Sequence, residues 1–340
     1  MIGIRQLTVL TTNQCTASCG HCLVSSSPQR RGRLSLGTIC ETIDEIIGRG
    51  NPLSLVIFAG GEPTLLKTDL LDAIAFCAEK GLGTRMVTNA SWAISETVAE
   101  RMVESFREAG LAEINYSVDD HHEPDIEFGR VVNAWRASKN KGFDSVVLAN
   151  CYGTSSRITA EFIREQLSED LPVYWEADGT PTTRDVPPSE DGTRYLLSNA
   201  RLQRLGRGAN LPDEAIEIPE QARLNSPCPW AIESAALSPG SHLVACCGTE
   251  AHGNEFLDFG DVRKHSIDEL LKVANQSLVV NAIRKFGPYF LMNFVKTFSQ
   301  EELFKKKYGS VCEICEDVVK NPKSREIINA HLSELSPFLE

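Results

Sequence analysis

Three cysteines, Cys15, Cys19 and Cys22, lie within eight residues near the start of the chain, in the stretch TTNQCTASCGHC. Thiolates at this spacing can hold a metal centre, but structural zinc takes four ligands and disulfides need an even number of thiols. His21 could complete a zinc site, although its place directly beside Cys22 makes it an awkward corner of the same tetrahedron. Three thiolates on a four-iron cluster instead leave one iron open to another molecule. The spacing therefore favours an iron–sulfur cluster over zinc.

A second candidate set, Gly60, Gly61, Glu62 and Pro63, ends the apolar run LSLVIFAGG. Glycines let a ligand come close to the backbone, and a carboxylate can accept hydrogen bonds from an ammonium group. The alternative for this stretch alone is a tight turn between a strand and a helix.

Taken together, the CxxxCxxC loop and the later GGEP motif resemble the signature of radical S-adenosylmethionine (SAM) enzymes. The resemblance implies that the open iron binds the amino and carboxylate groups of SAM. It further implies that the reduced cluster cleaves SAM to a 5′-deoxyadenosyl radical, which abstracts a hydrogen atom. GGEP would then bind the SAM amino group, and His21 would lie beside the adenine.

Two shorter matches follow at later strand ends. Thr88 and Asn89 in VTNA resemble the polar turn after the family's third strand. Ser117 and Asp119 in YSVDD resemble the fourth-strand segment that contacts the ribose and carboxylate of SAM. A capping or turn role is the alternative for each pair.

The elements that must position these residues alternate between strand and helix patterns. Strands are predicted over 4–12, 53–61, 84–90, 112–120, 144–151 and 171–178. Amphipathic helices are indicated by apolar stripes at Leu36, Ile39, Ile43 and Ile47, at Leu70, Ile74 and Cys77, and at Val98, Met102 and Phe106, the last helix opened by Ser95 and closed by Gly110. This alternation predicts an α/β fold with a parallel sheet, either open or an incomplete barrel. The family resemblance, covering residues 5–180, implies a partial (β/α)6 TIM-like barrel.

The pattern changes after about residue 185. Residues 179–193 are rich in turn formers and predict a loop, and short strands are expected within 235–247. Helices are expected over 266–276 and 299–309. We place a soft boundary near 210, which gives a core domain over 1–210 and a smaller α+β domain with a helical tail over 211–340.

The second domain contains four spaced cysteines, Cys228, Cys246, Cys312 and Cys315, which could bind zinc or an iron–sulfur cluster. They resemble the auxiliary-cluster domain of the SPASM/twitch group, with Ser241 where that group usually has glycine. No further cysteine follows the C-x-x-C pair, so the resemblance implies the shorter, twitch-like form with one auxiliary [4Fe–4S] cluster. Four thiolates would leave no open iron there, which favours electron transfer or structural support.

The remaining cysteines have less specific surroundings. Cys247 adjoins Cys246 and is the alternative auxiliary ligand, although the resemblance favours Cys246. Cys40 and Cys77 lie on apolar helix faces and are expected in the core. Cys151, near the end of the fifth strand, and Cys247 are candidate hydrogen-atom donors, with a buried structural role as the alternative.

His121, His122 and Glu123 could mimic a metal site, but their place between SVDD and a proline indicates a solvated loop.

The composition of the chain limits the kinds of molecule that we expect it to bind. The net charge of −12 argues against a surface that binds nucleic acid. The N-terminal residues lack a secretory signal, and no stretch approaches the roughly 20 apolar residues that span a bilayer. We therefore expect a cytoplasmic protein without membrane partners, whose eleven cysteines bind metal rather than form disulfides.

Three functions fit these features. Because auxiliary-cluster members often act on peptides, the resemblance favours modification of a ribosomally made peptide by crosslinking, thioether formation or epimerisation. The second is a dehydrogenase for an amino sugar or cyclitol, with the auxiliary cluster as electron acceptor. The third is a non-catalytic zinc- or cluster-binding scaffold. We also expect an external reductant such as flavodoxin or ferredoxin. Since the predicted barrel begins almost at residue 1, the peptide would be selected by a separate leader-binding protein or bound directly.

Overall fold

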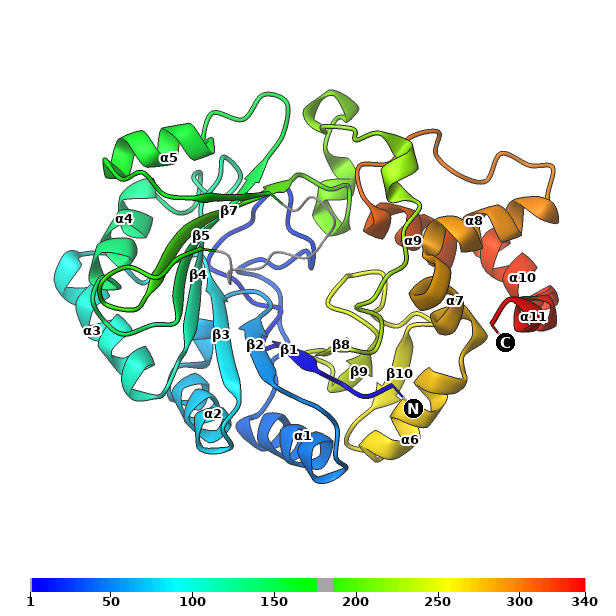
Figure 1. Ribbon diagram of the computed structural model, residues 1–340, viewed down its shortest axis with the longest axis horizontal. Helices are drawn as coiled ribbons and strands as arrows, with labels where there is room; N and C mark the ends of the chain where they lie inside the picture. Colours follow the sequence, from blue (N-terminus) through cyan, green and yellow to red (C-terminus); the bar gives the residue numbers. More distant parts are fainter. Residues whose placement is uncertain (1, 176–185, 340) are drawn as a thin grey trace.

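Figure 1 shows the computed structural model, which describes residues 2–175 and 186–339. Ten strands in this part of the chain form one sheet. They are β1 Gln6–Leu10, β2 Leu55–Ala59, β3 Gly83–Thr88, β4 Glu113–Ser117, β5 Ser145–Tyr152, β6 Val173–Trp175, β7 Arg194–Arg201, β8 Ser234–Leu237, β9 His242–Val244 and β10 Asp258–Asp261. Each of the six predicted strands of the first domain overlaps an observed strand, because apolar runs such as QLTVL and LVIFA pack largely inside the protein.

The strand order is β10-β9-β8-β1-β2-β3-β4-β5-β7-β6. All neighbours from β8 to β6 are parallel, and β9 pairs antiparallel with both β8 and β10. The sheet curves strongly but does not close, so the predicted α/β fold with a partial barrel is confirmed (Figure 1). In such a sheet the carboxyl ends of the parallel strands share one edge, where sites belong.

The sixth barrel position differs from the prediction. The strand predicted over 171–178 is the short edge strand β6, and its last three residues lie outside the described part of the chain. The neighbour of β5 is instead β7, which pairs with it over eight residues, from Ser145↔Arg194 to Tyr152↔Arg201. The sequence analysis missed β7 because its alternation is interrupted by the polar pair Ser198 and Asn199.

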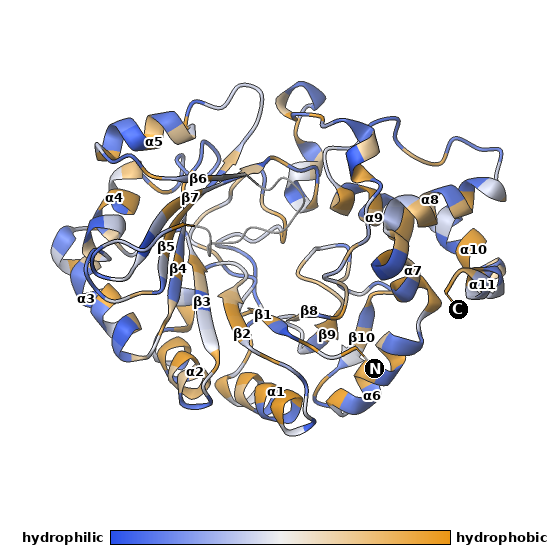
Figure 2. Cartoon of the chain, viewed as in Figure 1, coloured by the Kyte–Doolittle hydropathy of each residue, from blue (hydrophilic) through white to orange (hydrophobic). Residues whose placement is uncertain are grey.

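The helices of the first domain follow the strands as expected. They are α1 Leu36–Gly48, α2 Thr68–Glu79, α3 Glu96–Glu108, α4 Phe128–Ala137 and α5 Ala160–Leu167. Ser95 caps α3 by accepting a hydrogen bond from Val98 N, and Gly110 follows its end at φ +93°. Cys77 is fully buried in the core, as predicted, whereas Cys40 is half-buried. Helices such as α3 carry both hydrophilic and hydrophobic residues, which suits elements that cover one face of a sheet (Figure 2).

The C-terminal part contains α6 Ile267–Gln276, α7 Leu278–Phe286, α8 Pro288–Thr297, α9 Val311–Lys320, α10 Pro322–Ala330 and α11 Ser336–Leu339. Short 3₁₀ turns span Pro63–Leu66, Gly206–Asn210, Asp213–Ala215, Gln221–Leu224 and Leu332–Leu335. The predicted helix over 266–276 is confirmed, with a capping box between Ser266 and Glu269. Among the helices described, none is long and apolar enough to cross a membrane.

The helix predicted over 299–309 is wrong. There the backbone amides bond to side chains of other elements, since Tyr308 N donates to Gln221 Oε1 (2.9 Å) and Lys305 N to Asp317 Oδ2 (3.3 Å). A helix begins only after Ser310, whose hydroxyl accepts a hydrogen bond from Glu313 N.

The two predicted domains share the sheet. β8 pairs parallel with β1, with Leu7 opposite Ala235, and β9 and β10 extend the sheet beyond it. The chain after 210 therefore continues the barrel sheet on the far side of β1, while the boundary near 210 stays a prediction.

Candidate functional site: two cysteine centres and the segment between them

The three N-terminal cysteines converge in the loop between β1 and α1. Cys19 is buried, Cys15 and Cys22 are half-buried, and all three pack around Ala17 and Ile126. The loop is folded by its own backbone, because Cys15 N donates to Ser27 O (3.1 Å) and Cys22 N to Cys19 O (3.2 Å). Burial raises the pKa of Cys15 to about 12, with further contributions from Glu62 and the other two thiols. A metal centre that binds Cys15 would have to displace the proton of its thiol.

The GGEP motif is joined to the cysteine loop through the backbone. Gly61 N donates to Thr12 O (2.7 Å), and Glu62 N donates to Gln14 O (3.0 Å). A Cβ on Gly61 would lie 1.9 Å from Gln14 O, so only glycine allows this approach. Gly60 adopts φ +121° beside it, which also favours glycine. The two motifs are therefore one structural unit, and Pro63 starts the turn that follows.

The carboxylate of Glu62 faces the end of β3. Its Oε1 accepts hydrogen bonds from Thr64 N (3.2 Å), Thr64 Oγ1 (2.7 Å) and Thr88 Oγ1 (2.8 Å). Its Oε2 accepts from Asn89 N (3.0 Å). Burial raises the pKa of Glu62, and these donors oppose the rise. The carboxylate thus ties β2 to β3, while ammonium binding by the motif stays a prediction.

Asn89 connects this network to the cysteines. Its side-chain amide nitrogen lies 3.5 Å from Cys15 Sγ and donates to Thr16 Oγ1 (3.0 Å). Thr88 also accepts a hydrogen bond from Trp92 Nε1 (3.1 Å). The predicted residues Glu62, Thr88 and Asn89 therefore come together beside Cys15.

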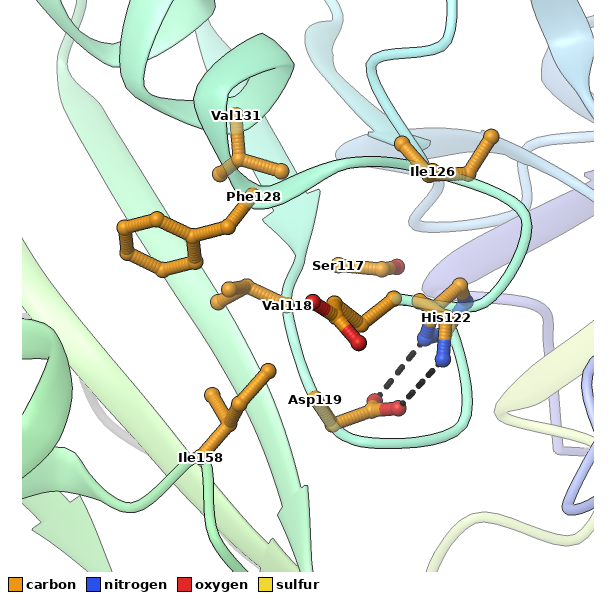
Figure 3. Close-up of a pocket in the computed structure, with 9 residues that line it drawn as sticks. Ser117, Val118, Asp119, His122, Ile126, Phe128, Val131 and Ile158 are labelled. Atoms are coloured by element: carbon orange, nitrogen blue, oxygen red, sulfur yellow. Dashed lines mark hydrogen bonds and ion pairs between the residues drawn. The ribbon is translucent and has the colours of Figure 1, made fainter.

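Ser117 is the last residue of β4 and Asp119 follows it; both line the small pocket in Figure 3, where Asp119 points toward His122. The buried Asp119 accepts a hydrogen bond from His122 Nδ1 (2.9 Å) and lies 3.4 Å from His21 Nε2. Burial opposes ionisation of Asp119, but His122 and His21 outweigh it and hold the pKa of this carboxyl well below its usual range.

The predicted solvated loop at His121, His122 and Glu123 is only partly right. Glu123 is exposed, but His122 keeps only 17% of its side chain exposed, and His121 stacks on His21 with ring centroids 4.8 Å apart. Burial disfavours the charged ring of His122, but Asp119 outweighs it and raises the pKa of His122 to about 10. Asp119 draws the loop inward through His122, three residues later, and the contacts of His21 with Asp119 and His121 add a tertiary part that the local sequence does not encode.

His21 retains one free atom. Its Nδ1 is buried and has no hydrogen-bond partner in the described part of the chain. His21, Asp119 and His122 place their ligand atoms within 4.8 Å of one another, close enough to share a metal ion. Asp119 already faces both rings, so a hydrogen-bond network explains the arrangement except for the unpaired His21 Nδ1.

Arg207, which the sequence analysis missed, clamps the cysteine loop. Its Nη1 donates to Cys19 O (2.7 Å), its Nη2 to Ser26 O (2.5 Å), and its backbone N to Cys22 O (3.0 Å). Gly206 allows the contact, since a Cβ there would lie 2.1 Å from Leu23 O. The run RLQRLGRG contains the only local signal, an arginine between two glycines.

The same segment reaches the second cysteine set. Arg204 donates from its backbone N (2.8 Å) and Nε (3.2 Å) to the buried carboxylate of Glu313, which lies between Cys312 and Cys315 on α9. Ser310 Oγ donates to Gln203 Oε1 (2.9 Å) at the start of that helix. Residues 203–207, here called the strap, therefore contact both cysteine regions.

The four C-terminal cysteines come from three separate segments and converge. Cys315 is buried on α9, Cys312 is exposed, and Cys228 and Cys246 are half-buried. The pKa values of Cys246 and Cys315 lie well above the usual thiol range, first because of burial and then because of Glu250 and the neighbouring thiols. These thiols therefore influence one another, while an auxiliary cluster bound by them stays a prediction.

The two candidate hydrogen donors differ in their surroundings. Cys247 is exposed, although the protein around its thiol and the nearby Glu250 raise its pKa to about 11. Cys151 is half-buried near the end of β5, opposite Ala200 of β7. Cys246 rather than Cys247 lies among Cys312 and Cys315, which supports the predicted ligand without testing it.

Parts of this chain are similar in sequence to known proteins. Residues 9–155 match the Radical SAM superfamily. YydG of Bacillus subtilis (strain 168), named provisionally as a peptide biosynthesis protein, is 20% identical over 305 residues, which covers 89% of this chain and 88% of that protein. The similarity of residues 9–155 to that superfamily is consistent with a site for a [4Fe–4S] cluster and SAM.

Solved structures show the same fold at low identity. Native anSMEcpe with bound AdoMet superposes with a TM-score of 0.56 at 10% identity, covering 98% of this chain and 99% of that one. Its complex with AdoMet and the Cp18Cys peptide gives 0.53 at 11% identity, covering 98% of both chains. These structures support the partial barrel.

Proposed function

We propose that this protein is a radical SAM enzyme that modifies a ribosomally made peptide. The observation that carries the proposal is the unit formed by the three converging thiols of Cys15, Cys19 and Cys22 with the GGEP backbone. When bound, the cluster and SAM supply a 5′-deoxyadenosyl radical that abstracts a hydrogen atom. An open set of three thiolates suits this chemistry better than zinc does.

The residues of the site have separate tasks in this proposal. The three cysteines hold the cluster, and Gly60 and Gly61 let the GGEP turn pack against the backbone of the cysteine loop. The free, buried Nδ1 of His21 offers a hydrogen bond to the bound nucleoside. Ser117 and Asp119 line the adjoining pocket and would contact the rest of SAM. The second cysteine set would hold one auxiliary [4Fe–4S] cluster.

The peptide substrate is supported by the relative YydG, whose name assigns it provisionally to peptide biosynthesis and whose match covers nearly the whole chain. A separate leader-binding protein or direct binding would select the peptide. The expected cytoplasmic location would keep the thiols reduced.

Among peptide modifications, the exposed thiol of Cys247 favours epimerisation. After a Cα hydrogen is removed, Cys247 would donate its S–H hydrogen atom to the opposite face of the Cα radical. The resulting sulfur radical then needs one electron and one proton to return to the thiol. In this proposal the auxiliary cluster, reduced by flavodoxin or ferredoxin, would pass that electron.

The test uses anaerobically purified protein with SAM, a reductant and a short peptide encoded beside its gene. We expect 5′-deoxyadenosine, and in deuterium oxide a single deuterium at an inverted residue. Cys247→Ala should stop deuterium incorporation but not 5′-deoxyadenosine formation, and Cys151→Ala tests the other candidate donor in the same way. Normal incorporation in Cys247→Ala would remove this residue as donor.

Other outcomes identify the competing functions. A changed peptide mass would indicate crosslinking or thioether formation. An unchanged peptide with an oxidised amino sugar or cyclitol would indicate the dehydrogenase. A colourless protein that holds zinc and forms no 5′-deoxyadenosine would indicate a scaffold.

A further inference from the structure

Asn89 brings a side-chain hydrogen-bond donor from the end of β3 to the cysteine loop. The residue follows the last residue of the strand and is 5% exposed. Its Nδ2 donates to Cys15 Sγ at 3.5 Å and to Thr16 Oγ1 at 3.0 Å. An amide nitrogen carries two hydrogens, so these two acceptors account for both. Hydrogen bonds to ionised acceptors are the stronger ones, so the bond to Cys15 would strengthen once this residue is a thiolate.

The orientation of the Asn89 amide is fixed by its own turn. Its Oδ1 accepts a hydrogen bond from Ser91 N (3.0 Å). Because a backbone N–H can only donate, the amide oxygen must face Ser91, and the nitrogen must then face Cys15. The hydroxyl of Thr16 donates its own hydrogen to Ser91 Oγ (2.9 Å), which leaves the Thr16 oxygen to accept from Asn89.

The turn that presents Asn89 has an unusual backbone. Ala90 is fully buried and adopts φ +58°, a region that residues with a Cβ rarely enter. Two hydrogen bonds hold the turn there, from Ala90 N to Thr88 Oγ1 (3.2 Å) and from Asn89 N to Glu62 Oε2 (3.0 Å). Strained backbone of this kind persists only where the surroundings enforce it, and it collects at functional sites.

A second thiol of the loop has a donor of a different kind. Cys22 Sγ accepts a hydrogen bond from Ser26 N (3.3 Å), a backbone group of the same loop. That bond comes with the loop conformation, whereas the bond to Cys15 needs a particular side chain from another strand. Asn89 is therefore a donor that one substitution can remove.

We propose that Asn89 is a positioning residue that sets the reduction potential of the cluster on Cys15, Cys19 and Cys22, here called the open centre, through its N–H···S hydrogen bond to Cys15. The proposal rests on the cluster of the proposed function. Hydrogen bonds to the sulfurs are among the factors that set the potential of an iron–sulfur cluster. An added electron increases the negative charge on these sulfurs, so the donor would stabilise the reduced form and make the open centre easier to reduce.

The test uses the full-length protein, reconstituted anaerobically with iron and sulfide. The open centre is identified as the part of the reduced electron paramagnetic resonance spectrum that is lost in Cys19→Ala. We expect Asn89→Leu, which removes the donor without adding a charge, to shift the potential of this signal to a more negative value. Asn133→Leu is the matched control and should leave the potential unchanged, because the Asn133 amide on α4 donates to Ala93 O (3.1 Å) and not to a thiol.

A direct measurement does not depend on how well the variant folds. Wild-type protein labelled with ¹⁵N at its asparagine side chains should show ¹⁵N hyperfine coupling in the signal of the open centre, because a hydrogen bond to a ligand sulfur carries spin density to the donor nitrogen. The coupling should persist in Asn133→Leu and vanish in Asn89→Leu.

Two results would overturn the role of Asn89. They are the absence of ¹⁵N coupling in the labelled wild-type protein and an unchanged potential in Asn89→Leu. If the wild-type protein forms 5′-deoxyadenosine, either result leaves the radical SAM site standing. If no signal is lost in Cys19→Ala, the open centre itself is absent, and this proposal is wrong together with the proposed function.

Discussion

The two cysteine centres are built in opposite ways. Cys15, Cys19 and Cys22 come from one loop whose backbone folds on itself and on the neighbouring GGEP turn. The C-terminal set gathers Cys228, Cys246, Cys312 and Cys315 from three distant segments. A local site keeps its geometry from its own turn, whereas a composite site depends on how the surrounding elements pack.

The strap, residues 203–207, contacts both cysteine centres. Arg207 holds the carbonyls of the first loop, and Arg204, three residues earlier, holds Glu313 beside the C-x-x-C pair. Changes at the two arginines should therefore affect different centres, although both arise in one short segment.

The largest effect is expected for Cys19→Ala. Removing one of three thiolates should abolish the open cluster and with it all 5′-deoxyadenosine formation, because the other two thiols cannot hold it. The measurement is 5′-deoxyadenosine by chromatography together with iron content, which should fall to about four per chain, the complement of one remaining auxiliary cluster. Complete loss of iron would show that the centres do not form independently.

Arg204→Ala should cost about 3–5 kcal/mol of the free energy of unfolding, because it leaves the buried Glu313 carboxylate without its cation. Denaturant unfolding of the metal-free protein measures this. Arg223→Ala is the control, since Arg223 is exposed and pairs only with Glu220. Equal stability of the two variants would contradict the role of the strap at α9.

Arg207→Ala should lower the rate of 5′-deoxyadenosine formation by about tenfold while leaving the auxiliary signal unchanged. The reason is the loss of two charge-assisted hydrogen bonds to the cysteine loop, each contributing on the order of 1.5–3 kcal/mol, part of which the loop can recover with water. If the spectroscopic signal of the auxiliary cluster fell as much as the rate of 5′-deoxyadenosine formation, Arg207 would not act on the first centre alone.

The smallest effect is expected for Glu62→Gln. The amide keeps one acceptor oxygen but turns a donor toward Thr88 or Asn89, which should destabilise the fold by about 1–3 kcal/mol. SAM affinity, measured by equilibrium dialysis on the reconstituted protein, should fall more than it does in Cys40→Ala, a half-buried control on α1. An unchanged affinity would confine Glu62 to a structural role.

Much of the fold followed from local pattern. The strand and helix alternation, the Ser95 cap and the buried Cys77 could all be predicted because each depends on a few adjacent residues. The insertion of β7 beside β5 and the unwound stretch before Ser310 could not, because both depend on partners far along the chain.

The candidate site likewise has parts that the sequence predicted and parts that it did not. The sequence by itself determined the three-cysteine loop and GGEP, since spacing and glycine requirements are local properties. Only the tertiary structure decided the stacking of His121 on His21, the clamp by Arg207 and the place of Glu250 beside Cys246. The physical reason is that buried charges are fixed by the partners that surround them, and those partners are brought together only when the chain packs.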